Sequence, residues 1–90
     1  MSAAIYTLDP DFMKQPPVLR IAVLVQLRAL AAPVVRELQD GPLSCRDLMA
    51  KLGIADDDVN AMADLIVTLL QLQAFGLVTK HVPVERGPLP

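Results

Sequence analysis

VVRELQDGPLSCRDLMAKLGIADDDVNAMADLIVTLLQLQAFGLVTKH (residues 34–81) is the stretch that decides the fold of this chain. Helix-forming residues run up to a Gly-Pro pair, and a short helical segment then starts at a serine and stops at Gly53. A longer segment of helical periodicity ends at Gly76, where residues 77–82 switch to a β-branched pattern. The order of three helices and one strand predicts a mainly α-helical domain with a short strand at its C-terminal end.

The short middle helix carries a start signal and a stop signal. Ser44 is a favourable N-cap residue, and Asp47, three positions later, completes an approximate capping box. Gly53 suits the left-handed conformation that often ends a helix. We therefore expect a helix between Ser44 and Gly53, with an apolar stripe formed by Leu48, Met49 and Leu52.

The third helix is expected over about residues 59–75. Three aspartates, residues 56–58, precede it; one of them caps the helix and all three favour its positive N-terminal dipole. Polar residues at spacings of four, four and three predict its solvent-facing side, which consists of Asn60, Asp64, Thr68 and Gln71. The predicted buried side consists of Val59, Met62, Ala63, Ile66, Leu69, Leu70 and Leu72.

The chain before this stretch is predicted to form a long first helix over about residues 17–39, with a kink or break at Pro33. Between Val18 and Leu30 almost its whole circumference is apolar, and such a helix must be covered on most sides. Ninety residues provide too little protein for that cover. A second copy of the chain, or another protein, is therefore expected to dock on Leu19, Val23, Leu24, Leu27 and Leu30.

The two ends are expected to lie outside the folded domain, which spans residues 17–82. Residues 1–16 are interpreted as a loosely attached N-terminal arm that holds one helical turn, with Asp9 as its N-cap. Residues 83–90, which contain three prolines and a glycine, are interpreted as a flexible tail.

The core and turn positions of the central stretch resemble those of bacterial winged helix-turn-helix regulators of the ArsR and MarR type. The resemblance covers about residues 34–81, and the residues that carry it are Leu38, Gly41, Pro42, Leu43, Ser44, Asp47, Leu48, Leu52, Gly53, Ile54, Gly76, Leu77, Val78 and Lys80. It implies a winged-helix-like three-helix core with a long N-terminal helix and with a short β-strand or truncated wing at the C-terminus.

The same resemblance implies a small transcriptional regulator that binds DNA as a dimer, with its third helix in the major groove. The residues that would then read bases are Asn60, Thr68 and Gln71. Those that would contact phosphates are Arg46, Lys51, Lys80, His81 and Arg86.

Three departures from these regulators, together with the net charge, favour an alternative, a protein–protein interaction module that has the winged-helix fold without DNA binding. The turn at residues 56–58 is triply acidic and the net charge is −2, so neither attracts phosphates. The third helix is longer than in the resembled regulators, and the eight residues after Val82 are too few for a full wing. An adaptor, a subunit of a larger complex or an inhibitor would fit this alternative, and both interpretations stay open.

Catalysis, metal binding and a cofactor are not expected. The chain has one histidine, one cysteine and no glycine-rich phosphate loop. A single cysteine, Cys45, cannot form an intrachain disulfide or a zinc cluster.

Cytoplasmic residence without a membrane span is the expected location. The N-terminus lacks the basic region and apolar core of a secretion signal. The longest apolar run, residues 18–35, is interrupted by Arg20, Gln26 and Arg28. Each arginine costs about 2.5–3.5 kcal/mol at the centre of a membrane helix, so this run is not expected to insert.

Overall fold

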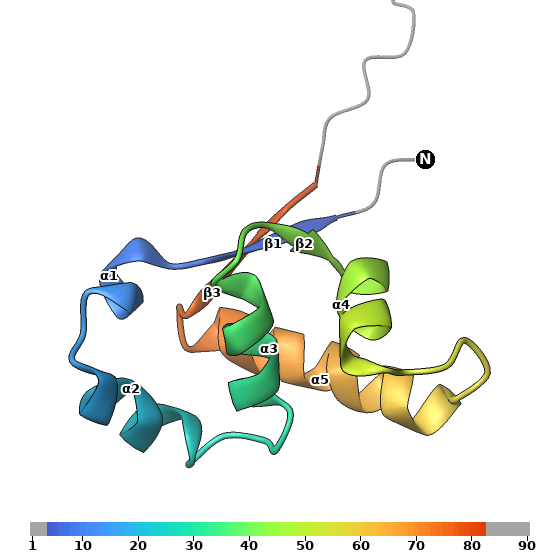
Figure 1. Ribbon diagram of the computed structural model, residues 1–90, viewed down its shortest axis with the longest axis horizontal. Helices are drawn as coiled ribbons and strands as arrows, with labels where there is room; N and C mark the ends of the chain where they lie inside the picture. The colour runs from blue at the N-terminus through green and yellow to red at the C-terminus, as the bar shows by residue number, and fades with distance from the viewer. Residues whose placement is uncertain (1–3, 83–90) are drawn as a thin grey trace, which may run out of the picture.

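The computed structural model describes residues 4–82 of the chain (Figure 1). Five helices and three short strands follow one another within these residues. Their order is β1 (Ile5–Leu8), α1 (Pro10–Met13), α2 (Pro17–Leu24), α3 (Ala31–Leu38), β2 (Leu43–Ser44), α4 (Cys45–Leu52), α5 (Val59–Ala74) and β3 (Val78–His81). The predicted tail at residues 83–90 lies outside the described residues.

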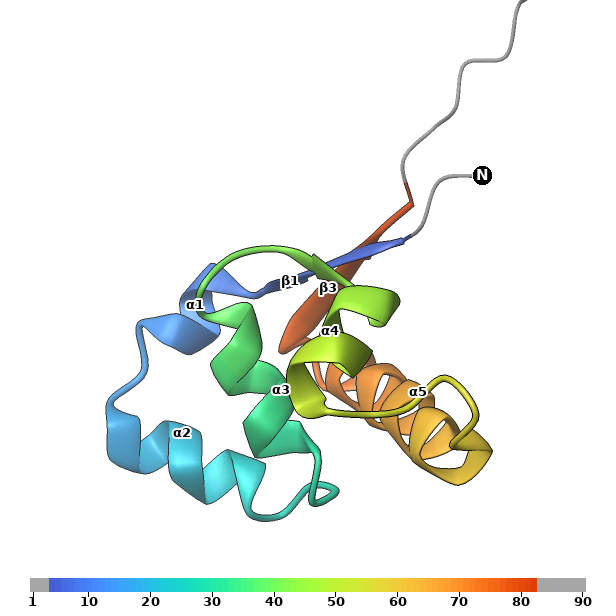
Figure 2. The same ribbon diagram turned by 45° about the vertical axis from the view of Figure 1, so that its right-hand side comes forward.

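The three strands form one antiparallel sheet in the order β2-β1-β3 (Figures 1 and 2). Tyr6 in the central strand is opposite Leu43 on one side and Lys80 on the other. Isoleucine, tyrosine and threonine make β1 a good strand former. The expectation of a loosely attached N-terminal arm was therefore wrong for residues 5–13, because β1 is the strand that joins the other two.

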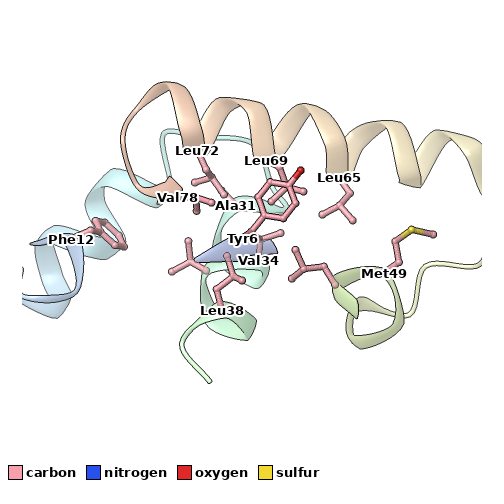
Figure 3. Close-up of a cluster of buried hydrophobic side chains, with 12 residues drawn as sticks. Tyr6, Phe12, Ala31, Val34, Leu38, Met49, Leu65, Leu69, Leu72 and Val78 are labelled. Atoms are coloured by element: carbon pink, nitrogen blue, oxygen red, sulfur yellow. The ribbon is translucent and has the colours of Figure 1, made fainter. Parts of the chain in front are cut away.

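The core lies between α5, α3, α4 and the sheet. Figure 3 shows the leucine stripe of α5, which consists of Leu65, Leu69 and Leu72, pointing toward Ala31 and Val34 of α3 and toward Tyr6 of β1. All three leucines are buried. Complete burial of a leucine side chain contributes about 1.5–3 kcal/mol, so this stripe is the main attachment of α5 to the rest of the domain.

The capping signals around α4 are confirmed. The Ser44 hydroxyl accepts a hydrogen bond from the Asp47 amide at 3.1 Å, and the Asp47 carboxylate accepts one from the Ser44 amide at 3.4 Å. Gly53 ends the helix with a φ of +72°, in the left-handed region where a side chain is strained. The predicted cap at Asp9 is also confirmed, since its carboxylate accepts from the Phe12 amide at 3.1 Å.

The long first helix was predicted wrongly. The chain leaves the helical path between Val25 and Leu30, which separates α2 from α3, and Pro33 lies in the first turn of α3. Proline is tolerated there because the first amides of a helix have no partner within the helix. The break therefore precedes the proline, and α2 lies beyond α3 at one edge of the molecule (Figures 1 and 2).

The predicted fold class is confirmed in its coarse part. The domain is rich in helices, but the three-stranded sheet makes it a mixed α/β structure and not simply a mainly α one. The sequence pattern had indicated one strand, whereas β1 and β2 are two more.

A pair of substitutions in β1 tests whether this strand belongs to the core. Tyr6 is buried, whereas its neighbour Thr7 is partly exposed. We expect Tyr6→Ala to lower the free energy of unfolding by about 3 kcal/mol, since removal of a large buried ring leaves a cavity. Thr7→Ala should cost less than about 1 kcal/mol. Urea unfolding followed by circular dichroism measures both, and equal costs for the two variants would contradict the central position of β1.

Candidate functional site

The polar stripe predicted for the solvent side of α5 is only partly exposed: Asn60 lies in solvent, Asp64 and Gln71 are half-buried, and Thr68 is buried. Thr68 has no exposed surface, and its hydroxyl donates to the Asp64 carbonyl oxygen at 2.7 Å. This bond within one helical turn satisfies a buried hydroxyl without a partner from outside the helix. The expectation that Thr68 faces solvent is therefore wrong, and its side chain is not accessible from outside.

Arg28, in the segment between α2 and α3, contacts two other residues of the stripe, Asp64 and Gln71. Its guanidinium donates through Nε to Asp64 Oδ1 at 2.9 Å and also through Nη2, and its backbone amide donates to Gln71 Oε1 at 3.1 Å. The two charged side chains are 44% and 38% exposed, so solvent screens the ion pair and it contributes less than about 1 kcal/mol. These contacts hold the segment against α5 and engage both Asp64 and Gln71.

The opposite side of α5 is apolar and exposed to solvent. We define the α5 apolar face as the exposed residues Val59, Ala63, Ile66, Val67, Leu70 and Ala74. Most of them follow spacings of four, three, four and four residues, which place them on one side of a helix. In both views α3 and α4 lie on one side of α5 and no described element covers the other (Figures 1 and 2).

The predicted buried side of α5 was thus largely wrong. Val59, Ala63, Ile66 and Leu70 were expected in the core and belong to the α5 apolar face, whereas Leu69 and Leu72 are buried as expected. Sequence reasoning missed Leu65, which completes the leucine stripe. The signal available was composition, since the buried stripe consists of leucines alone, whereas the α5 apolar face mixes valine, isoleucine and alanine with one leucine.

The basic residues predicted to contact phosphates are only partly brought together. Arg46 and Lys51 are exposed on α4, but five residues of helix turn through about 140° beyond a full turn, so they point in different directions. Lys80 and His81 are exposed on β3, and Arg86 lies outside the described residues. Asn60 is exposed on α5, beside an acidic turn whose last residue, Asp58, caps the helix through a hydrogen bond from the Ala61 amide.

The residues predicted for a partner interface on the first helix fall into two groups. Leu19 and Val23 are exposed on α2, which buries none of its residues. Leu24, Leu27 and Leu30 are partly buried against the core of their own chain. The exposed part of this predicted interface is therefore smaller than expected and belongs to a helix of eight residues.

Neither a reactive thiol nor a metal cluster emerges from residues 4–82. Burial raises the pKa of the Cys45 thiol, which disfavours the reactive thiolate at neutral pH. Burial, and to a lesser extent the Cys45 thiolate, raises the pKa of Tyr6. No three His, Cys, Asp or Glu side chains in this range gather to hold a metal ion. The candidate functional surface is therefore the α5 apolar face, whose large side chains are exposed to solvent.

Comparison with known proteins gives no match: no protein-family model, no curated protein and no solved structure is significantly similar to this chain. Among the helices described, none combines the length and the apolar character that crossing a bilayer requires.

Neighbouring leucines on α5 test which side of the helix is buried. Leu69 is 1% exposed and Leu70 is 58% exposed. We expect Leu69→Ala to lower the free energy of unfolding by about 2–5 kcal/mol, through lost burial and a cavity. Leu70→Ala should change it by no more than about 0.5 kcal/mol at a concentration where the chain is monomeric. Chemical denaturation of the two variants gives both values, and the reverse order would mean that the helix is turned the other way.

Proposed function

We propose that this chain is a protein–protein interaction module, and that it forms a homodimer by packing the α5 apolar face against the same face of a second copy. The observation that carries the proposal is the exposure of this face on a helix of 16 residues, about 24 Å long. Soluble proteins tolerate single exposed apolar side chains, but a continuous apolar stripe along a whole helix is typical of an interaction surface.

The energetics favour covering this face. Its four large side chains, Val59, Ile66, Val67 and Leu70, are between 44% and 71% exposed. Complete burial of such a side chain contributes about 1.5–3 kcal/mol, and roughly half of that gain is still available to each of them. Ala63 and Ala74 are small, which lets a second helix approach closely. No charged side chain belongs to the face, so two copies can meet without burying an unpaired charge.

Charge at the ends of α5 favours an antiparallel arrangement of the two helices. Asp56, Asp57 and Asp58 are all exposed at its N-terminal end. A parallel pair would bring six carboxylates together, whereas an antiparallel pair separates the two acidic turns by the length of the helix. An antiparallel pair about a two-fold axis also uses the same residues on both copies.

The order of elements supports the finer assignment of a winged-helix-like fold. From α3 onward the chain contains a helix, a short helix, a longer helix and a final strand, which is the order that the resemblance implies. The strand after the third helix, β3, would pair in a wing with the strand that returns from it. Here β1 pairs with β3 over four residues and takes that position in the sheet.

The same assignment explains why DNA binding receives less support. In the resembled regulators the third helix faces the major groove, where bases are read by hydrogen bonds. In this chain that helix is α5, and its outer side offers alkyl groups. The exposed basic residues Arg46, Lys51 and Lys80 remain the support for the DNA-binding alternative.

Self-association of the chain tests the proposed interface. Light scattering after size exclusion should show a dimer for the natural sequence and a monomer for Ile66→Glu/Leu70→Glu, because a dimer would bury four carboxylates without partners. The matched control is Val18→Glu/Ile21→Glu, which places the same charges on exposed positions of α2. This control should stay dimeric. Monomeric α2 variants together with dimeric α5 variants would transfer the interface to α2 and reject the α5 apolar face.

A mobility-shift assay with random duplex DNA at low salt tests the alternative function. We expect no retardation at micromolar protein, because the described surface presents few basic groups and an acidic turn. Retardation that weakens steeply as salt increases would instead establish DNA binding. If it were also lost in Arg46→Ala/Lys51→Ala, the contacts would be those predicted on α4.

A further inference from the structure

A cleft separate from the α5 apolar face lies between α1, α2 and α3. Its volume is about 220 Å³. Five of the side chains that line it are apolar and two are polar, namely Phe12, Pro17, Ile21, Leu24 and Val35 together with Arg20 and Gln39. It is therefore an apolar cleft with one positive charge.

Arg20 is incompletely satisfied. Its Nε atom is shielded from solvent and has no hydrogen-bond partner among the described residues. Its Nη1 atom donates to Met13 Sδ at 3.7 Å, and a thioether sulfur is a weak acceptor. Within residues 4–82 no carboxylate forms an ion pair with it. Arg28, by contrast, is exposed and forms an ion pair with Asp64. Arg20 differs from it in having neither a carboxylate partner among residues 4–82 nor a fully exposed position.

A guanidinium whose acceptor is a thioether sulfur, next to apolar walls, has a specific complement. A carboxylate accepts two hydrogen bonds from one guanidinium, and its geometry matches the planar donors. An apolar body attached to that carboxylate would cover Ile21, Leu24 and Val35. A phosphate dianion would leave charge uncompensated, since among residues 4–82 one guanidinium is the only charged group lining the cleft.

We propose that this cleft binds a small aliphatic monocarboxylic acid, with its carboxylate on Arg20 and its hydrocarbon chain along α2 and α3. The Met13 contact gives way to the carboxylate, and the guanidinium then gains the strong acceptor that it lacks. An apolar cavity of about 150 Å³ is sufficient for the six carbon atoms of benzene. A volume of 220 Å³ accordingly suits about eight or nine non-hydrogen atoms, as in hexanoate.

Binding would also affect α2. This helix buries none of its residues, and its neighbour across the cleft is α3. A ligand that contacts Ile21 and Leu24 on one side and Val35 on the other adds apolar contacts between the two helices. The site thus couples occupancy of the cleft to the anchoring of α2.

Titration of the ¹⁵N-labelled full chain with hexanoate at pH 7 tests the proposal. Amide signals around Ile21, Leu24 and Val35 should shift and saturate with a dissociation constant on the order of 1 mM, as expected for a ligand of this size. Hexan-1-ol, which has the same chain without the charge, should bind at least about 10-fold more weakly. Signals from the α5 apolar face should stay unchanged, which separates this site from the proposed dimer interface.

Two variants and one control locate the ligand. Arg20→Met removes the guanidinium and keeps an apolar side chain, and it should raise the dissociation constant of hexanoate at least about 10-fold. Ile21→Trp, at a largely exposed position, should fill the cleft and abolish the shifts. Arg36→Met removes an exposed arginine of α3 that does not line the cleft, and it should change binding less than about 2-fold. The amide spectrum of each free variant shows whether it folds; should Arg20→Met unfold, Ile21→Trp decides by itself. Absence of shifts at ten times the expected constant, equal binding of hexan-1-ol, or unchanged binding by a folded Arg20→Met would overturn the proposal.

Discussion

The leucine stripe of α5 is the contact on which the remaining structure depends. Leu65, Leu69 and Leu72 enter the space between α3 and β1, and their burial determines how the helix is turned about its axis. Asp64 and Gln71 are thereby directed toward the segment between α2 and α3, where Arg28 engages both. The α5 apolar face, on the other side of the helix, is left in solvent. The packing of the leucine stripe therefore buries Thr68, half-buries Asp64 and Gln71, and leaves the α5 apolar face exposed.

The strand β1 is the middle strand of the sheet and contributes Tyr6 to the core. Tyr6 packs under α5, while the backbone of the strand pairs with residues from two distant parts of the chain. Asp9, immediately after the strand, continues this attachment, because its amide donates to the Leu77 carbonyl oxygen at 2.9 Å. Backbone hydrogen bonds therefore attach residues 5–9 to the segment that follows α5. Among residues 4–82, the strand paired with β3 is β1.

Two surfaces of different chemistry result from this arrangement. The α5 apolar face is uncharged and extends along a whole helix, as a helix-packing surface does. The cleft beside α2 is small and contains a guanidinium, as a site for an anionic small molecule does. They lie on different helices, with α3 between α2 and α5 in the view of Figure 2. Occupancy of one need not block the other, so a protein interaction and a ligand site can coexist on this small domain.

Local signals in the sequence determined the ends of the helices α1, α4 and α5, because a capping residue or a terminal glycine affects only the few residues next to it. Ser44 with Asp47, Gly53, Asp9 and Gly76 all end or begin elements where the pattern indicated. Only the tertiary structure decided the direction of α5, since this helix has two apolar stripes and either could have entered the core. The leucine stripe fills the space against α3 and Tyr6, and which stripe fits that space depends on the shape of elements far away in the chain. The role of β1 and the break between α2 and α3 were decided in the same way, by pairing and packing partners far away in the chain, which no local pattern contains.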